Sequence, residues 1–303
     1  MNTITKTYTA YAKVNLALDV LGKRPDGYHD VRMIMQNLNI FDELEFTVSE
    51  KKSGEDFSSS KAENYNIEIE TNKPELPTDE SNLIYKAILL MFKEYNVSGD
   101  VHVKLTKNIP IEAGMAGGSS DCAATLKAIN DIFSLNATTD DLMKLGVKLG
   151  ADVPFCILGK TALSEGIGEI LTPVTGLPDC SVLVVKPPIG VSTALIYNNI
   201  KCDELTSRPD TDGMLQALED HNIIKVASTM ENVMETVTTN LYPEINQIKA
   251  AMKKYGALNA IMSGSGPTVF GIFTDSEKAW DAAIHIGELE LATDIFVTKP
   301  VNA

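Results

Sequence analysis

A run of small residues at 110–121, PIEAGMAGGSSD, constrains this chain more than any other feature. It leads out of a predicted strand and directly into the start of a predicted helix. Small residues let the backbone approach a ligand closely, and the first N–H groups of a helix have no partner within the helix. The run therefore predicts an anion-binding turn, above all one for phosphate. A plain glycine-rich turn with a serine N-cap, Ser119 or Ser120, is the alternative that the pattern leaves open.

The order of residues in this run excludes the common P-loop, because no lysine follows its last glycine. A second glycine-serine run, Ser263-Gly264-Ser265-Gly266-Pro267, separates two further predicted strands. Such a loop is often only a turn. Two of them in one chain favour a phosphate site with two sides, to which Ser119 or Ser120 presents a hydroxyl for phosphate or Mg²⁺.

A third motif, Gly150-Ala151-Asp152-Val153-Pro154, places one carboxylate in an otherwise apolar turn. Burying that carboxylate without a partner is costly. It either caps a neighbouring stretch of backbone or pairs with Lys13, the cation on the polar face of a predicted strand at 12–20. The sequence does not decide between these two.

Periodicity predicts a mixture of strands and helices without a strict βαβ rhythm, so the fold class is α+β. The predicted strands cover residues 12–20, 101–106, 182–186, 260–262, 268–273 and 295–299. The predicted helices cover residues 82–95, 119–133, 140–149 and 244–255, with a last helix from 276, and Ser81 and Ser276 are the N-cap candidates. A chain of 303 residues is long for a single core. We expect two domains, 1–165 and 166–303, joined in a stretch rich in glycine and proline.

Composition excludes several classes of function. With 26 basic and 41 acidic residues, the net charge of −15 argues against sequence-independent binding of nucleic acid. No apolar run approaches the ~20 residues of a membrane helix, and the first residues do not resemble a signal peptide. We therefore expect a cytoplasmic protein that binds a small molecule, with no nucleic-acid or membrane partner and with an unknown oligomeric state.

The potential metal ligands are scattered along the chain. The four cysteines, at 122, 156, 180 and 202, match no zinc spacing and predict buried, reduced thiols. Residues 42–80 hold 12 acidic and 4 basic residues, a pattern typical of a solvated face, and KKSGEDFSSSKAEN at 51–64 predicts a mobile loop. No residue is assigned to a metal.

In their order and spacing, Lys13-Val14-Asn15, PIEAGMAGGSSD, GADVP and SGSGP resemble the superfamily of galactokinase, homoserine kinase, mevalonate kinase and phosphomevalonate kinase, the GHMP kinases. The segments 12–30 and 149–169 resemble most closely a member that acts on a cytidine diphosphate-linked methylerythritol. The resemblance implies the two-domain GHMP kinase fold, with the active site in the interdomain cleft. It also implies transfer of the γ-phosphoryl group of ATP, with Mg²⁺, to the tertiary 2-hydroxyl of the methylerythritol unit.

The resemblance also implies roles for individual residues. Lys13 and Asp152 match the catalytic pair. Asn15, Tyr28, His29, Thr193 and Tyr197 match substrate-binding positions, with Tyr28, His29 and Tyr197 at the cytosine. The ATP-phosphate loop comprises Pro110, Ile111, Glu112, Ala113, Gly114, Met115, Ala116, Gly117, Gly118, Ser119 and Ser120. Glu112 departs from the small residue that is usual in the family, and repulsion from triphosphate predicts that its carboxylate points away.

Two other functions remain as alternatives. A GHMP kinase for homoserine or mevalonate would have no use for the aromatic and imidazole set of Tyr28, His29 and Tyr197. A non-catalytic nucleotide-binding or sugar-sensing module would be expected to have lost Lys13 or Asp152, and both are present.

Overall fold

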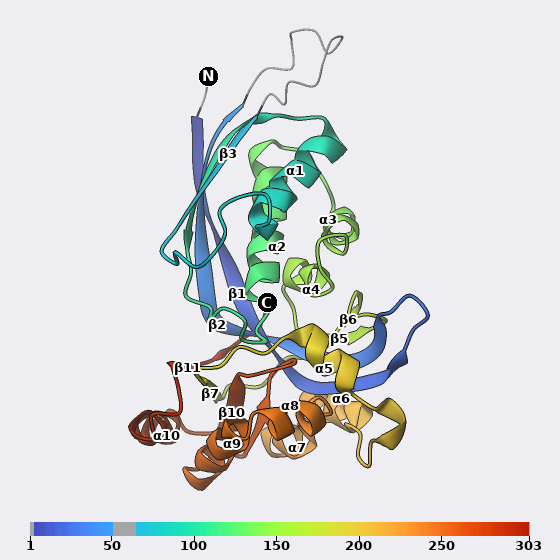
Figure 1. The fold of residues 1–303 in the computed structure, drawn as a ribbon, viewed down its shortest axis with the longest axis vertical. Helices are drawn as coiled ribbons and strands as arrows, with labels where there is room; N and C mark the ends of the chain where they lie inside the picture. The colour runs from blue at the N-terminus through green and yellow to red at the C-terminus, as the bar shows by residue number, and fades with distance from the viewer. Residues whose placement is uncertain (1–2, 51–64, 303) are drawn as a thin grey trace. The chain divides into compact units, whose positions relative to one another are not determined.

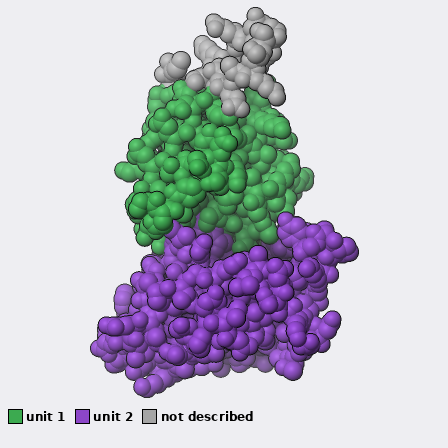
Figure 2. Space-filling view, viewed as in Figure 1, with its two compact units in different colours: residues 1–11, 41–108, 118–158 green, residues 12–40, 109–117, 159–303 purple. Residues whose placement is uncertain are grey.

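The computed structural model describes residues 3–50 and 65–302, so the predicted mobile loop at 51–64 lies entirely outside the described residues. The chain forms two compact units, shown in different colours in Figure 2. Unit 1 comprises residues 1–11, 41–108 and 118–158, and unit 2 comprises residues 12–40, 109–117 and 159–303. The units draw on alternating stretches of the chain, and the single boundary expected between residues 165 and 166 stays a prediction.

Unit 1 contains a sheet with helices on one of its faces (Figure 1). The strand order is β3-β4-β2-β1, with β3 parallel to β4 and β2 antiparallel to β4. These strands are β1 (Thr3–Lys23), β2 (His29–Glu50), β3 (Asn66–Thr71) and β4 (Gly99–Thr106). The helices are α1 (Leu83–Tyr95), α2 (Gly117–Ile132), α3 (Thr139–Gly146) and α4 (Val153–Leu158). Only the first part of β1 and the last part of β2 belong to this unit.

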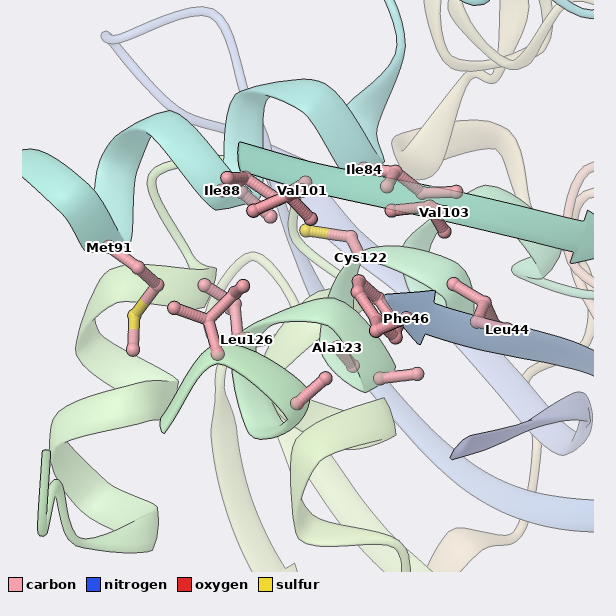
Figure 3. Packing of buried hydrophobic residues seen from close by; sticks show 14 of the residues in the cluster. Leu44, Phe46, Ile84, Ile88, Met91, Val101, Val103, Cys122, Ala123 and Leu126 are labelled. Atoms are coloured by element: carbon pink, nitrogen blue, oxygen red, sulfur yellow. The ribbon is translucent and has the colours of Figure 1, made fainter. Parts of the chain in front are cut away.

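The core of unit 1 follows from the alternation of apolar residues in its strands and their helical spacing in α1 and α2. Figure 3 shows the buried side chains of the sheet packing against those of the two helices. Those labelled are Leu44, Phe46, Val101 and Val103 from the sheet, Ile84, Ile88 and Met91 from α1, and Cys122, Ala123 and Leu126 from α2. This packing fixes α2, whose first residues form the end of the glycine-rich run.

Unit 2 contains the remaining parts of β1 and β2, the short strands that extend their sheet, and a second sheet. The short strands are β5 (Ala162–Glu165), β6 (Ile170–Pro173), β8 (Glu231–Asn232) and β12 (Pro300–Val301). The second sheet is antiparallel in the order β11-β7-β10-β9. Its strands are β7 (Ser181–Lys186), β9 (Asn259–Met262), β10 (Val269–Phe273) and β11 (Asp294–Thr298).

Unit 2 also carries most of the helices. They are α5 (Thr193–Asn199), α6 (Thr211–Glu219), α7 (Ile223–Thr229), α8 (Glu235–Leu241), α9 (Glu244–Lys254) and α10 (Ser276–Glu288), with a 3₁₀ turn at Cys202–Glu204. The mixture of antiparallel strands and helices confirms the α+β class. Within residues 3–50 and 65–302, no helix is long and apolar enough to cross a membrane.

The four cysteines are free thiols, as predicted, but only two of them are buried. Cys122 and Cys180 are buried, and Cys156 and Cys202 are half-buried. Burial raises the pKa of Cys180 to about 12, which leaves it protonated at neutral pH. In the part of the chain that the structure describes, no three His, Cys, Asp or Glu side chains gather as a metal site.

Candidate active site

The glycine-rich loop in unit 2 has an unusual backbone. Its φ angle is positive at every second residue, 51° at Glu112, 71° at Gly114 and 57° at Ala116. Alternation of left-handed residues with residues of negative φ is typical of backbone concavities whose N–H groups bind an anion. Pro110, Ala113 and Met115 are buried, so a ligand would meet the backbone of this loop and the exposed side chain of Glu112.

The second glycine-serine loop packs directly against the first. Ser263 Oγ donates a hydrogen bond to the carbonyl oxygen of Gly114 over 3.0 Å. A Cβ atom on Gly114 would lie 2.3 Å from the carbonyl oxygen of Ser263, so only glycine permits this approach. Asn232 holds the second loop in turn, because its Nδ2 donates to the carbonyl oxygens of Met262 and Gly264 over 2.8 Å each.

A cavity of about 490 Å³ opens beside these two loops, within unit 2. Thr193 and Ser265 line it, and their hydroxyl oxygens are 2.8 Å apart. The Glu112 carboxylate lies against Gly190, where a Cβ atom would be 2.8 Å from Oε2. The full lining is Glu112, Gly114, Gly190, Val191, Ser192, Thr193, Ser265 and Gly266. Its hydroxyl groups and glycines suit a polar ligand.

Lys13 and Asn15 occupy the polar face of β1, as predicted. Lys13 is 4% exposed, and its Nζ donates to Oδ1 of Asn15 over 2.8 Å. The backbone N–H of Lys13 donates to the carbonyl oxygen of Met115 over 3.1 Å, which ties β1 to the glycine-rich loop. Nδ2 of Asn15 contacts the sulfur of Met33 at 3.1 Å. These bonds fix both side chains beside the loop.

The structure brings together two of the three residues predicted to bind cytosine. The rings of His29 and Tyr197 are stacked, with centroids 5.0 Å apart and an interplanar angle of 30°. Burial of His29, together with the nearby charge of Lys23, lowers the pKa of its imidazole below the usual 6.5. Thr193 lies one helical turn before Tyr197 in α5. Tyr28 is 59% exposed, in the turn before β2.

In unit 1, the start of α2 lies beside the turn that carries Asp152. A Cβ atom on Gly150 would be 3.7 Å from Oγ of Ser119, and Asp152 directly precedes α4. Ser120 is buried, and its hydroxyl donates to the carbonyl oxygen of Tyr11 over 2.7 Å. Because α2 already begins at Gly117, both serines lie within its first turn, and the N-cap interpretation is wrong. Ser119 is the serine whose hydroxyl lies beside the Gly150–Asp152 turn.

The predicted site residues thus fall into two groups. Lys13, Asn15, Tyr28, His29, Thr193, Tyr197 and residues 110–117 belong to unit 2, and Gly118, Ser119, Ser120 and Asp152 belong to unit 1. The pairing of Lys13 with Asp152 stays a prediction, as does the orientation of Glu112 relative to triphosphate. Sequence reasoning missed Gly190 and Asn232. The Pro-Pro-Ile-Gly turn at 187–190 was a usable signal for Gly190, whereas nothing local marks Asn232.

Comparison with known proteins assigns the chain to a family. The family described as GHMP kinases N terminal domain matches residues 82–160, and the one described as GHMP kinases C terminal matches residues 214–284. The chain belongs to the GHMP kinases, small-molecule kinases that take their phosphoryl group from ATP.

Relatives similar along their whole length narrow the class. The chain is 50% identical to 4-diphosphocytidyl-2-C-methyl-D-erythritol kinase of Lachnoclostridium phytofermentans, over 96% of this chain and 98% of that protein. It is 48% identical to the enzyme of the same name from Lachnospira eligens, over 89% of each chain. Within the GHMP kinases, it belongs to the 4-diphosphocytidyl-2-C-methyl-D-erythritol kinase family.

Solved structures agree with this assignment. A crystal structure of 4-(cytidine 5'-diphospho)-2C-methyl-D-erythritol kinase matches with a TM-score of 0.79 and 28% identity, over 98% of this chain and all of that one. A homoserine kinase from Cytophaga hutchinsonii matches with a TM-score of 0.75 and 19% identity, over 100% of this chain and 96% of that one. The second likeness shows a common fold only.

Proposed function

We propose that this protein phosphorylates the 2-hydroxyl of 4-diphosphocytidyl-2-C-methyl-D-erythritol with ATP, as a step of the non-mevalonate isoprenoid pathway, in the cytoplasm. The stacked pair of His29 and Tyr197 carries the choice of substrate. An aromatic and an imidazole ring suit a pyrimidine, and a homoserine or mevalonate kinase would have no use for them. The relatives at 42–50% identity that bear this name support the same substrate.

The proposed chemistry assigns one role to each member of the catalytic pair. Asp152 orients the acceptor hydroxyl and accepts its proton late, because phosphoryl transfer passes through a loose transition state that needs little base strength. Lys13 offsets negative charge on the transferring group. Its bond to Asn15 and the backbone bond to Met115 support this role, since they hold the ammonium group beside the loop.

The glycine-rich loop is proposed to hold the phosphates of ATP through its backbone N–H groups. Alternating positive φ angles from Glu112 to Ala116 support this assignment. Mg²⁺, when bound, neutralises phosphate charge, and it usually takes only one or two protein oxygens beside those of the nucleotide. The hydroxyl of Ser119 fits such a ligand, because it lies at the start of α2 beside the turn that carries Asp152.

We propose that Tyr28, His29 and Tyr197 read the cytosine. Stacking on a ring contributes ~1–3 kcal/mol but accepts any base. Selection of cytosine over uracil needs hydrogen bonds to the edge at which the two bases differ, and a site whose own groups are left unpaired rejects the wrong base. The lowered pKa of His29 keeps its imidazole neutral at pH 7, with one donor and one acceptor nitrogen.

A coupled assay of ADP release tests the proposal. The panel comprises the cytidine substrate, its uridine analogue, free methylerythritol, homoserine and mevalonate, each compared by kcat/KM. We expect turnover of the cytidine compound to exceed that of every other alcohol by at least about 100-fold, the discrimination that a hydrogen-bonded polar edge supports. Equal use of the uridine analogue or of free methylerythritol would refute cytosine reading. A preference for homoserine or mevalonate would refute the substrate class.

A further inference from the structure

Three charged side chains are buried together in unit 1, and no step of the proposed reaction uses them. Nζ of Lys107 lies 2.6 Å from Oδ2 of Asp42 and 2.5 Å from Oδ2 of Asp121. None of the three side chains is more than 6% exposed. A buried ion pair adds little net stability, because lost hydration offsets the attraction between the charges. The positions of Asp42, Lys107 and Asp121 in the chain suggest a role for this cluster other than stability.

Each member of this cluster lies within three residues of the first or last residue of a stretch that belongs to unit 1. After its first stretch in unit 1, the chain returns to this unit at Phe41, leaves it after Asn108 and returns again at Gly118. The segment between Lys107 and Asp121 therefore contains the whole glycine-rich loop. The ion pair of Lys107 with Asp121 joins the two ends of that loop, and Asp42 holds the same ammonium group from β2.

Backbone hydrogen bonds extend the cluster at the first end of the loop. Oδ1 of Asp42 accepts from the N–H of Asn108 over 2.6 Å. The amide of Asn72 is bonded to both sides of Lys107, accepting from its N–H over 2.7 Å and donating to its carbonyl oxygen over 3.2 Å. At the other end, Asp121 follows the first turn of α2, which is fixed by the core. The two ends thus have one defined separation.

We propose that Asp42, Lys107 and Asp121 form a positioning cluster that sets the separation of the two ends of the glycine-rich loop, and thereby its ability to bind the phosphates of ATP. The inference rests on the proposed function of that loop. The three residues act through the loop backbone and are positioning residues. Backbone N–H groups bind phosphate well only when they converge on it, so a change in end separation weakens ATP binding before it affects the alcohol substrate.

Asp121→Leu is the decisive substitution, because the leucine side chain has the same branching at Cγ as aspartate but offers no acceptor to Lys107. We expect KM and Kd for ATP to rise about tenfold or more, a change of ~1.4 kcal/mol, while KM for the alcohol changes little. Asp121→Asn keeps an acceptor for Lys107, so its affinity for ATP should stay close to that of the wild type. Through-space electrostatics predicts the opposite sign, since loss of a carboxylate near a polyanion site would tighten binding.

A double variant separates positioning from stability. Lys107→Met with Asp121→Leu replaces the ion pair by apolar packing, which often restores stability. A merely structural role predicts that ATP affinity returns together with Tm, whereas positioning predicts that Tm returns and ATP affinity does not. The double variant also serves if Asp121→Leu alone does not fold.

The matched control is Asp131→Leu. Asp131 lies on the same helix α2, in an ion pair with Lys6 whose members are 52% and 46% exposed, and its loss should leave ATP affinity unchanged. Calorimetry with ATP alone measures the effect without the alcohol substrate. A wild-type protein that binds ATP but ignores the cytidine alcohol would refute the proposed substrate and leave this inference standing. Unchanged ATP affinity in Asp121→Leu would overturn the inference itself.

Discussion

Asp152 and Lys13 are the residues on which the proposed chemistry depends most directly. Asp152→Asn should keep the fold and the affinity for ATP, yet lower kcat by about 10²–10⁴-fold, because an amide cannot accept the proton of the hydroxyl. Single-turnover kinetics together with ATP calorimetry measures both quantities. A kcat close to that of the wild type would show that Asp152 has no such role.

Lys13→Ala should lower kcat more than it raises KM for ATP. Its ammonium group is proposed to act on charge that develops during transfer, so its loss affects the transition state more than the ground state. Steady-state kinetics with varied ATP checks this split. An effect confined to KM would make Lys13 a binding residue only. Lys6→Ala, which removes an exposed ammonium group from the same strand, is the control and should alter neither constant.

His29 gives the proposed site a pH dependence of known sign. Because its pKa in the folded protein is below 6.5, the imidazole is neutral at pH 7 and gains a proton only in more acidic solution. KM for the cytidine substrate should therefore be constant above pH 7 and rise at a midpoint below 6.5. The contribution of neutral His29 to the stability of the fold is complete above the unfolded pKa of ~6.5, and it is lost as pH falls from there through the lower pKa of the folded protein.

The control for this pH dependence is His29→Asn, which cannot titrate in this range. Its KM should be higher than that of the wild type but independent of pH between 5 and 8. A wild-type KM that does not change over this interval would contradict a role for neutral His29 in reading the base.

At the scale of elements, the contact between the two glycine-serine loops depends on Gly114. Gly114→Ala should weaken ATP binding strongly, since its Cβ would be 2.3 Å from the carbonyl oxygen of Ser263 and 3.0 Å from that of Gly266. Neither backbone carbonyl can yield without moving its loop. Calorimetry with ATP and a thermal melt measure the two effects, and an unchanged Kd would show that this contact is not needed.

Gly27→Ala is the matched control for this substitution. Gly27 also has a positive φ, 91°, but a Cβ there would meet nothing within 4 Å. It therefore incurs only the backbone strain, of order 1–3 kcal/mol, and should lower Tm without weakening ATP binding. The difference between the two variants isolates the contact between the loops.

Elements with clear periodicity were predictable from the sequence. The helix expected at 82–95 is α1 (Leu83–Tyr95), and the strand expected at 182–186 is β7 (Ser181–Lys186). The N-caps were wrong by one residue. Asn82 caps α1, since its Oδ1 accepts from the N–H of Ile84. The hydroxyl of Ser81 instead donates to Asp79 over 2.6 Å. Asp275 caps α10, and Ser276 is its first residue.

The extent of the long strands was not predictable. The alternation marked residues 12–20, but β1 runs from Thr3 to Lys23, because the ends of such a strand are partly exposed and tolerate polar residues on both faces. The candidate site likewise has a part that was predictable from the sequence and a part that was not. The glycine-rich loop was evident from local composition, whereas the contacts of Asn232 and the cluster around Lys107 join residues distant in sequence and leave no local pattern.

For the molecule as a whole, Gln36 joins the C-terminal residues to the middle of the chain within unit 2. Its Oε1 accepts from the hydroxyl of Thr161 and the N–H of Leu177, and its Nε2 donates to the carbonyl oxygen of Val301 and to Oδ1 of Asn302. Gln36→Leu leaves two buried groups, the hydroxyl of Thr161 and the N–H of Leu177, without their acceptor. The free energy of unfolding should fall by about 3 kcal/mol, since each unpaired group costs ~1–3 kcal/mol.

Denaturant titration checks this expectation, with Gln216→Leu as the control. Gln216 is exposed, and its amide is bonded to Asp220 only one helical turn away, so its loss should change stability by less than ~0.5 kcal/mol. Equal effects of the two substitutions would mean that the network around Gln36 does not hold the C-terminal residues.

The alternation of the chain between its two units has a consequence for synthesis on the ribosome. Unit 1 ends at Leu158, whereas unit 2 needs residues up to the C-terminus. The polypeptide is synthesised from its N-terminus at a finite rate, so every residue of unit 1 has been translated before the last stretch of unit 2, which begins at Gly159. The glycine-rich loop, however, packs against Ser263, which is translated much later. The loop therefore cannot form this contact until Ser263 has emerged from the ribosome. A nascent chain stalled before Ser263 should not be retained by a resin that carries immobilised ATP. The chain of residues 1–303 should be retained and active.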